Sequence, residues 1–499
     1  LPSRKRHNRT DTVSTIKGQG PRIGCTPLTQ RLAGSGFDPH STATRIKGPD
    51  NSSSPPETSA QREDHEVHFR SSARSAQRSP ATGVSLAITA GIALGVALTL
   101  MRLPRSTWDT LYAEDGREFL QAWVTSASPA LLLTPYDGYL HLWPRILSGL
   151  VAFLPVGAWP MATIMVFGAS VGLIGALSMI ASRAVISSRL LRLLVLAVPM
   201  LLPFAGVEAL GNLANLHWYF FYLAFWVCWS SPSSYGEALG WGAVLLVSVL
   251  TEIQLVFFAP VILFRAWRGT RHARTMLMGW MVGSAGQVLA YLASETTRTS
   301  RGLGDISSMW RGFLANVVLG TPIGHQPRVN RIVEVGGWLL PAMALLLLVI
   351  SLAVAGVRSS RHGCIISAAA IIAFTSWSFS FLINNYRGLD YAGVPFPLIR
   401  WGTGASLLLW AALLTAADAV VLSHPRAKKI VPPAAAILLL MSTFLSPASV
   451  SARHGAPSWA DQIIQARAQC EQADNAQTNV SVRHAPEGWS ISLPCERLL

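Results

Sequence analysis

The feature that most constrains the fold of this chain is a series of long apolar runs. A helix needs about 20 apolar residues to cross a bilayer. Two of the runs, 237–251 and 252–267, are short for separate crossings, and the polar residues Thr251, Glu252 and Gln254 separate them. The series predicts an all-α polytopic membrane protein with about eleven transmembrane helices, at 83–102, 158–182, 190–207, 213–230, 237–251, 252–267, 275–293, 336–356, 363–383, 399–421 and 430–447.

The composition agrees with this class of protein. Of the 499 residues 51% are hydrophobic and 13% charged, and the mean hydropathy is +0.38. The net charge of +15 could suggest a nucleic-acid partner. However, the basic residues fall mostly in the N-terminal tail and in short loops between the apolar runs, which is typical of membrane topology. We therefore expect membrane lipid, and no nucleic acid, as a partner.

A further apolar stretch, 138–156, resembles a crossing, and its placement decides the orientation of every later segment. If it stays on the outer surface, four basic loops fall on the cytoplasmic side, as the positive-inside rule favours. We therefore expect an outer 138–156, a cytoplasmic N-terminus and an extracytoplasmic C-terminus. The outer loop 294–335, which also carries several Arg, is the exception. The four basic loops hold Arg183, Arg189 and Arg192; Arg265, Arg268, Arg271 and Arg274; Arg358 and Arg361; and Arg426, Lys428 and Lys429.

This topology divides the chain into three parts. Residues 1–82 are rich in Ser, Arg, Pro, Thr and Gly and predict a disordered, basic, cytoplasmic tail, to which we assign no chemistry. Because the chain opens on Leu1 rather than Met, we expect that part of this tail is absent in the cell. The transmembrane domain is 83–447, with a first outer loop at 103–157 that carries amphipathic surface helices. The third part is a small extracytoplasmic segment, 448–499.

The C-terminal segment contains two of the five cysteines, Cys470 and Cys495. The stretch that ends at Cys470 reads as a helix, and the one that ends at Cys495 alternates like one or two short strands. Since disulfides persist outside the cytoplasm and so small a piece buries little core, we expect a Cys470–Cys495 disulfide in an α+β cap. The alternative is two unrelated thiols in a flexible tail.

The first outer loop and its surroundings carry a resemblance to a known family. The stretches "YAEDGREF" (112–119) and "GYLHLWPR" (138–145) follow a cytoplasmic N-terminus and one span, and precede a multi-span bundle. In this arrangement, and in the closing "PSWADQIIQARAQC" and "PEGWSISLPC", 83–499 resembles bacterial members of the GT-C superfamily of membrane glycosyltransferases. That resemblance implies an inverting enzyme of the cytoplasmic membrane. It would move a sugar from a polyprenyl-phosphate donor to an envelope glycan, lipid or protein acceptor.

The resemblance also implies roles for particular residues. In the superfamily the first-loop carboxylate is the general base or a metal ligand, and Asp115 matches that position best. The chain has no second unambiguous acidic metal motif, so dependence on a divalent cation is left open. Independently of the family, sugar transfer from a lipid phosphate needs a carboxylate to take the acceptor proton and cations to stabilise the departing phosphate. The candidates are Asp115 or Glu114 for the base, and Arg145, Arg387 and Arg400 for the phosphate.

Other polar and aromatic residues are predicted at the outer ends of the spans, where they would line a substrate cavity. Each has an ordinary alternative: an aromatic belt explains Trp218, and a structural ion pair explains Glu252 equally well. The candidates for this cavity are Tyr139, His141, His217, Trp218, Glu252 and Tyr386.

A different class of function stays open beside the enzyme, namely a transporter or lipid flippase of cell-envelope precursors. A transporter typically shows repeated halves with paired broken helices and charges near the middle of the membrane. The sequence shows no such repeat, and its ionisable residues gather at the outer ends of the spans. This pattern favours the enzyme.

Overall fold

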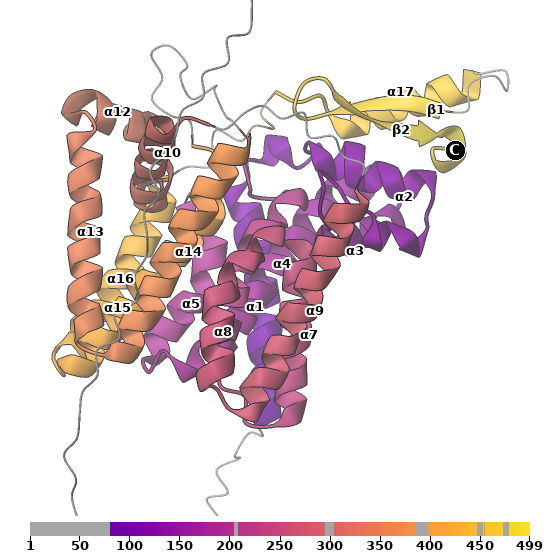
Figure 1. Ribbon diagram of the computed structural model, residues 1–499. Coiled ribbons are helices and arrows are strands. Elements are labelled where there is room, and N and C mark those ends of the chain that lie inside the picture. The colour runs from indigo at the N-terminus through magenta and orange to yellow at the C-terminus, as the bar shows by residue number, and fades with distance from the viewer. Residues whose placement is uncertain are drawn as a thin grey trace, which may run out of the picture. The chain divides into compact units, whose positions relative to one another are not determined.

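The computed structural model describes residues 80–203, 208–294, 304–384, 398–446, 453, 455–472 and 479–499. The predicted tail, 1–82, lies outside these residues except for the start of the first helix. The described part is mostly helical, with one small sheet (Figure 1). Its helices are α1 (Pro80–Arg102), α2 (Gln121–Thr125), α3 (Leu142–Ala152), α4 (Trp159–Ala181), α5 (Arg189–Leu201), α6 (His217–Trp229), α7 (Tyr235–Thr251), α8 (Ala259–Arg268), α9 (Arg271–Ala293), α10 (Ile306–Phe313), α11 (Gly320–Ile323), α12 (Gln326–Gly336), α13 (Leu339–Val357), α14 (Ser360–Asn384), α15 (Gly402–Ser423), α16 (Ala427–Phe444) and α17 (Trp459–Gln472).

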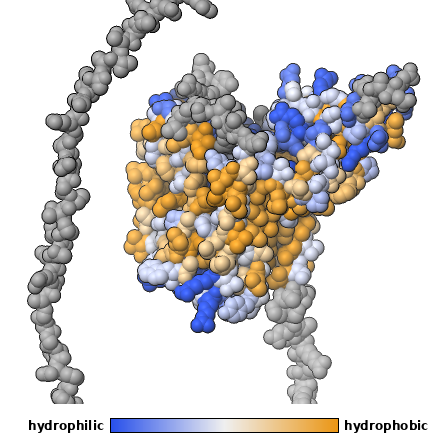
Figure 2. All heavy atoms as spheres, turned by 45° about the vertical axis from the view of Figure 1, so that its right-hand side comes forward, coloured by the Kyte–Doolittle hydropathy of each residue, from blue (hydrophilic) through white to orange (hydrophobic). Residues whose placement is uncertain are grey.

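Helices long and apolar enough to cross a membrane number seven among the described residues: α1, α4, α9, α13, α14, α15 and α16. Figure 2 shows hydrophobic side chains over the lateral face of the bundle, with hydrophilic ones gathered toward its two ends. A belt of this kind is what lipid contact requires. The predicted helical membrane protein is therefore confirmed, whereas the predicted count of about eleven spans is not.

The difference in count arises from the four apolar runs between 190 and 267. They form α5, α6, α7 and α8, of 13, 13, 17 and 10 residues, each shorter than the roughly 20 residues of a typical crossing. Every side chain of α6 is buried, so this helix is surrounded by protein and not by lipid. A helix that is apolar all round is a core helix or a span, and sequence alone does not separate the two.

Close approach of helix backbones fixes part of the bundle. α1 and α4 each carry two glycines four residues apart, and these face one another. A Cβ added to Gly95 would lie 2.3 Å from the carbonyl oxygen of Gly168, and one added to Gly172 would lie 2.1 Å from that of Gly91. Small residues at such spacing allow tight helix packing in membranes. Side chains larger than hydrogen would force α1 and α4 apart.

The four basic loops lie at one end of the bundle, at the bottom of Figure 1. Arg361, which begins α14, donates to the carbonyl oxygen of Ala184 after α4 at 2.6 Å. The stretch 138–156, expected not to cross, forms α3, whose 11 residues are too few for a span. α3 lies toward the other end of the bundle.

The C-terminal segment folds as the predicted α+β cap. Helix α17 packs on an antiparallel pair, β1 (Asn479–His484) and β2 (Trp489–Pro494), in which Asn479 pairs with Pro494 and His484 with Trp489. The predicted disulfide is present: Cys470 and Cys495 are bonded, with Cα atoms 5.5 Å apart. The described C-terminal residues thus form a cap held by a hydrophobic core and a covalent bond.

The cap completes its core with residues of the first loop. Trp459 packs against Trp159, with ring centres 6.3 Å apart, in a cluster that also contains Leu120. Backbone bonds join the same segments, since the amide of Trp459 donates to the carbonyl oxygen of Asp109 at 2.9 Å. The loop and the cap are therefore one packed unit. This unit holds in place the stretch "YAEDGREF" (112–119), called the acidic motif below.

Candidate functional site

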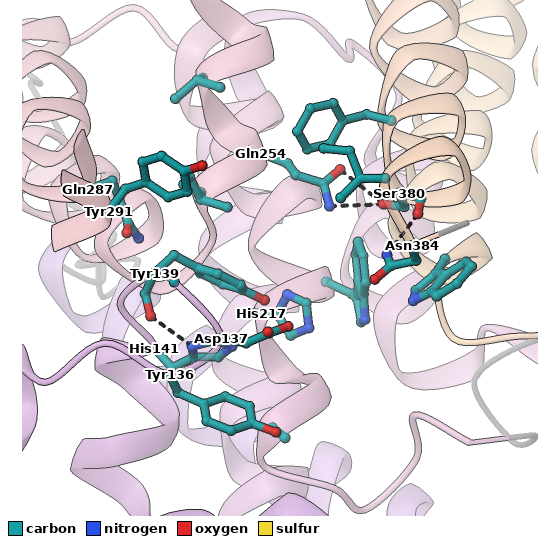
Figure 3. Close-up of a pocket in the computed structure, with 18 of the residues that line it drawn as sticks. Tyr136, Asp137, Tyr139, His141, His217, Gln254, Gln287, Tyr291, Ser380 and Asn384 are labelled. Carbon is teal, nitrogen blue, oxygen red and sulfur yellow. Dashed lines mark hydrogen bonds between the residues drawn. The ribbon is translucent and has the colours of Figure 1, made fainter. Parts of the chain in front are cut away.

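A cavity of about 530 Å³ is lined by the ends of α9 and α14 that lie away from the basic loops. Figure 3 shows this cavity in close-up. Its walls come from the acidic motif, the segment before α3, the start of α6, the 3-10 helix η8 (Ile253–Phe258), and α9, α14 and the start of α15. The lining residues are Glu114, Tyr136, Asp137, Gly138, Tyr139, His141, Ala214, Asn215, His217, Trp218, Ile253, Gln254, Val256, Phe257, Gln287, Val288, Tyr291, Phe379, Ser380, Ile383, Asn384, Arg400 and Trp401.

The cavity has a polar side and an apolar side. Glu114, His217 and Arg400 contribute to the first. The second includes Val288 of α9, which is 52% exposed, and Phe379 of α14, which is 41% exposed. The apolar wall is therefore accessible and is not sealed by neighbouring side chains. The site is therefore suited to an amphipathic molecule.

A tight turn places two tyrosines at the cavity. Asp137 and Gly138 have φ values of 52° and 90°, and Tyr136 and Tyr139 exchange backbone hydrogen bonds of 2.9 and 3.2 Å across them. Asp-Gly is a favoured pair for a two-residue turn in which both residues have positive φ. Buried Gln287 of α9 fixes the next residue by accepting from the amide of Leu140 at 2.9 Å and donating to its carbonyl oxygen at 3.2 Å.

The two carboxylates of the acidic motif point to different places. Asp115 is fully buried, and its oxygens accept from the amides of Leu213 and Ala214, each at 2.9 Å. It is not among the residues that line the cavity, whereas Glu114 is. Burial raises the pKa of Asp115 to about 7, although the two amides favour its ionised form. Asp115 is thus placed to hold the 213–214 backbone, and Glu114 to meet a ligand.

Arg400 carries the positive charge of the cavity. Its Nη2 lies 3.1 Å from Oε1 of Glu114, and its Nη1 lies 3.6 Å from Oε1 of Glu208. Burial lowers the pKa of Arg400, but Glu208 and Glu114 raise it further, so the net shift is upward. Glu208 was not predicted. Its only signal in the sequence is an acid next to a long apolar run.

Two further predicted residues form a hydrogen-bonded pair beside the cavity. Nδ1 of His217, at the start of α6, bonds Oε2 of Glu252, which is fully buried. Oε1 of Glu252 accepts from the amide of Gln254 at 2.7 Å. His217 and its neighbour Trp218 line the cavity, while Glu252 lies behind His217. Of the residues predicted to line a substrate cavity, Tyr139, His141, His217 and Trp218 line this one.

The ring of His141 lies among other rings at the cavity wall. Its centre is 4.1 Å from that of Tyr139 and 5.6 Å from that of His217. Burial and the neighbouring His217 hold the pKa of His141 well below its usual value, so this imidazole is neutral at pH 7. It can accept or donate a hydrogen bond without adding charge.

The three arginines predicted to share the donor phosphate do not all reach this cavity. Arg145 is 5% exposed and lies over the ring of Phe119, 5.4 Å from its centre, and it is not a lining residue. Burial lowers its pKa. Arg387, like the predicted cavity residue Tyr386, lies outside the described residues. Only Arg400 of the three is thus placed at the cavity by the described geometry.

The described residues do not offer a ligand set for a divalent cation. Across these ranges no group of three or more His, Cys, Asp and Glu side chains is placed to hold a metal ion. Glu114 is paired with Arg400 and Asp115 with two amides, so neither is arranged as a metal ligand. We derive no step through a metal.

The fold and the cavity define a helical membrane protein with an amphipathic site at one end of its bundle. Comparison with known protein families, with curated proteins and with solved structures finds no match. Function is therefore argued from the site itself.

Proposed function

We propose that this chain is a membrane glycosyltransferase. It would transfer a sugar from a polyprenyl-phosphate donor to an envelope glycan, lipid or protein acceptor at the outer face of the cytoplasmic membrane. The observation that carries the proposal is the cavity, where Glu114, Arg400 and His217 adjoin an apolar wall that includes the exposed side chains of Val288 and Phe379. A polyprenyl-phosphate sugar has the same division, with a long hydrocarbon chain at one end and an anionic, hydroxyl-rich head at the other.

Arg400 is the residue that we assign to the donor phosphate. A guanidinium matches phosphate oxygens with two parallel N–H donors and stays charged at every relevant pH. As the bond to the sugar breaks, negative charge grows on the departing phosphate, and a positioned cation stabilises it. Glu114 holds Arg400, and its Oε2 has no hydrogen-bond partner among the residues that the structure describes, so it would accept from a hydroxyl of the sugar. Asp115 supports the site from behind.

The proposed orientation follows from the basic loops. They lie at one end of the bundle, and the positive-inside rule favours the cytoplasm for that end. The cavity at the opposite end would then face outward. Donor would enter sideways from the bilayer between α9 and α14, and the acceptor hydroxyl would come from the aqueous side.

The test is donor-dependent release of polyprenyl phosphate by the purified protein in lipid nanodiscs. Polyprenyl-phosphate hexoses and pentoses would be supplied with an envelope extract as acceptor, and lipid products measured by mass spectrometry. We expect release with at least one donor, and a loss of at least tenfold in Arg400→Gln. Arg426→Gln, at the basic end, is the matched control. If no donor binds and none reacts, the proposal is contradicted. If the protein moves a fluorescent polyprenyl phosphate across liposome membranes without releasing polyprenyl phosphate from any donor, a flippase is favoured.

A further inference from the structure

The proposed function assigns roles to Arg400, Glu114 and Asp115, but none to the hydrogen-bonded pair His217 and Glu252. Both groups are buried: His217 is 7% exposed and Glu252 is fully buried. Of the two, only His217 lines the cavity. An ionisable pair in such a position costs free energy to bury unless its hydrogen bonds are satisfied. The contacts around Glu252 show how this pair is satisfied.

The carboxylate of Glu252 fixes the orientation of the His217 ring. Its Oε2 bonds Nδ1 of His217, and its Oε1 accepts from the amide of Gln254 at 2.7 Å. A carboxylate at Nδ1 favours the tautomer with the proton on that nitrogen, which leaves Nε2 as an acceptor. With Nδ1 held toward Glu252 behind it, Nε2 is the edge that His217 turns toward the cavity.

A second layer of hydrogen bonds keeps this arrangement rigid. Ser376 Oγ donates to Oε1 of Gln254 at 2.9 Å, and Nε2 of Gln254 donates to Ser380 Oγ at 2.9 Å. Both serines belong to α14, one wall of the cavity (Figure 3). The pair is therefore tied to a wall helix. Supported geometry of this kind is what a proton-transferring group requires.

Two carboxylates line the cavity, those of Glu114 and Asp137, and both are less suited to remove a proton. Asp137 is exposed, in the tight turn before α3. Oε1 of Glu114 lies 3.1 Å from Nη2 of Arg400, so a proton taken up by Glu114 would disrupt this ion pair. The imidazole of His217 has the carboxylate of Glu252 at its Nδ1, and a carboxylate in this position stabilises the imidazolium that forms when the ring takes a proton. His217 is also near neutral His141, whose ring adds no charge.

We propose that His217, oriented by Glu252, is the base that deprotonates the acceptor hydroxyl; this inference rests on the proposed glycosyl transfer. Nε2 of His217 takes the hydroxyl proton while the acceptor oxygen bonds the anomeric carbon. The bond from that carbon to the phosphate oxygen breaks, and its electron pair leaves with the polyprenyl phosphate. The imidazolium, hydrogen-bonded to Glu252, then releases its proton to water. His217 is thus a catalytic residue and Glu252 a positioning residue.

The experiment compares His217→Gln with His362→Gln in the release assay. His362 is a matched control because it is also buried and has its Nε2 3.5 Å from a carboxylate, that of Asp418, but it is not a lining residue. We expect His217→Gln to lower kcat by about 10²–10⁴-fold, the range for loss of a general base, with the donor KM nearly unchanged. In His217→Ala, added imidazole should restore part of the rate. Glu252→Gln should lower kcat and leave donor KM unchanged.

The outcomes separate this inference from the proposed function. If the wild type transfers sugar and His217→Gln retains its kcat, or loses activity only through a raised donor KM, the base assignment is wrong. If wild-type protein neither binds nor releases any donor, glycosyl transfer itself fails. If His217→Gln does not purify as a folded protein, Glu252→Gln decides, and a kcat equal to that of the wild type would overturn the inference.

Discussion

The guanidinium of Arg117 lies over the indole ring of Trp489, 3.5 Å from the ring centre. Arg117 belongs to the acidic motif of the first loop, and Trp489 begins β2 of the cap. A cation–π contact at an exposed position contributes roughly 0.5–1 kcal/mol. It is one of several contacts through which the cap reaches the motif that presents Glu114. Changes in the cap should therefore alter the cavity.

Gly116 provides the first test of that coupling. A Cβ at Gly116 would lie 2.4 Å from Nε2 of His484, a buried imidazole of β1. Gly116→Ala should push His484 aside and destabilise the protein by about 1–3 kcal/mol, the usual cost of overpacking. Thermal unfolding in detergent measures the change. In Gly157→Ala, where nothing lies within 4 Å of the added Cβ, the melting temperature should stay the same. Equal melting temperatures for both variants would contradict the coupling.

The disulfide is tested by replacing both of its cysteines with serine. Cys470 and Cys495 are 25 positions apart, and closing a loop of that size stabilises a fold by roughly 3 kcal/mol in the chain-entropy model. We expect faster proteolysis of the cap, and no labelling of either wild-type thiol without reductant. Cys364→Ser, at an exposed free cysteine, is the control. Wild-type protein in which both thiols label quantitatively without reductant would contradict the bond.

Asp115 should make stability depend on pH. Burial raises its pKa to about 7 in the folded protein, from an ordinary value of about 3.9 when unfolded. The folded state then holds the proton more tightly, so this residue favours folding below about pH 4, and that contribution is lost as the pH rises to about 7. The melting temperature of wild type should therefore fall over this window relative to Asp115→Asn. Asp461→Asn, at an exposed carboxyl, should keep the wild-type slope, and the same slope in Asp115→Asn would refute the assignment.

The ion pairs of Arg400 predict an asymmetry between two substitutions. Glu114→Gln leaves Arg400 with Glu208, whereas Arg400→Gln leaves two carboxylates without their cation. Arg400→Gln should therefore cost about 1–3 kcal/mol of stability and Glu114→Gln less, as measured by chemical unfolding. Arg331→Gln, which removes an exposed pair with Glu334, should cost less than 1 kcal/mol. Equal costs for the two cavity variants would contradict this account.

The proposed orientation is tested by labelling introduced cysteines in intact cells. Ser126 is exposed after α2, near the cavity end, and Ser423 is exposed at the basic end. With Cys364 replaced by serine, Ser126→Cys should react with a membrane-impermeant maleimide. Ser423→Cys should react only after the cells are permeabilised. The reverse pattern would place the cavity on the cytoplasmic side.

The sequence predicted those parts of the fold that depend on local pattern. Apolar runs identify the seven long helices, and the alternation before Cys495 identifies the cap. The short helices α5–α8 were not predicted as such, because an apolar run has the same composition whether its neighbours are lipid or protein. α6 is the clearest case: its aromatic-rich run predicts a span, whereas the helix has 13 residues and is buried along its whole length.

The sequence suggested which types of residue form the site, but not which way their side chains point. Glu114 and Asp115 are adjacent, and sequence does not tell which one faces a cavity. That choice is set by Ala113, whose φ of 48° turns the chain just before them, and whose amide bonds Ala485 of the cap at 2.6 Å. Glu208 and Gln287 were missed because their roles depend on partners distant in the chain. Polar residues in or beside apolar runs were the available signal.

The packing of the first loop against the cap also has a consequence for biosynthesis. Asp109 leaves the ribosome soon after α1, yet Ser458, whose hydroxyl donates to its carboxylate at 2.6 Å, is synthesised 349 residues later. Until then the acidic motif has no cap to pack against, however many helices have already entered the bilayer. A chain that stops before Ser458 would insert its helices and still lack a finished site. If the proposed function is right, activity would therefore require that translation has continued to the cap.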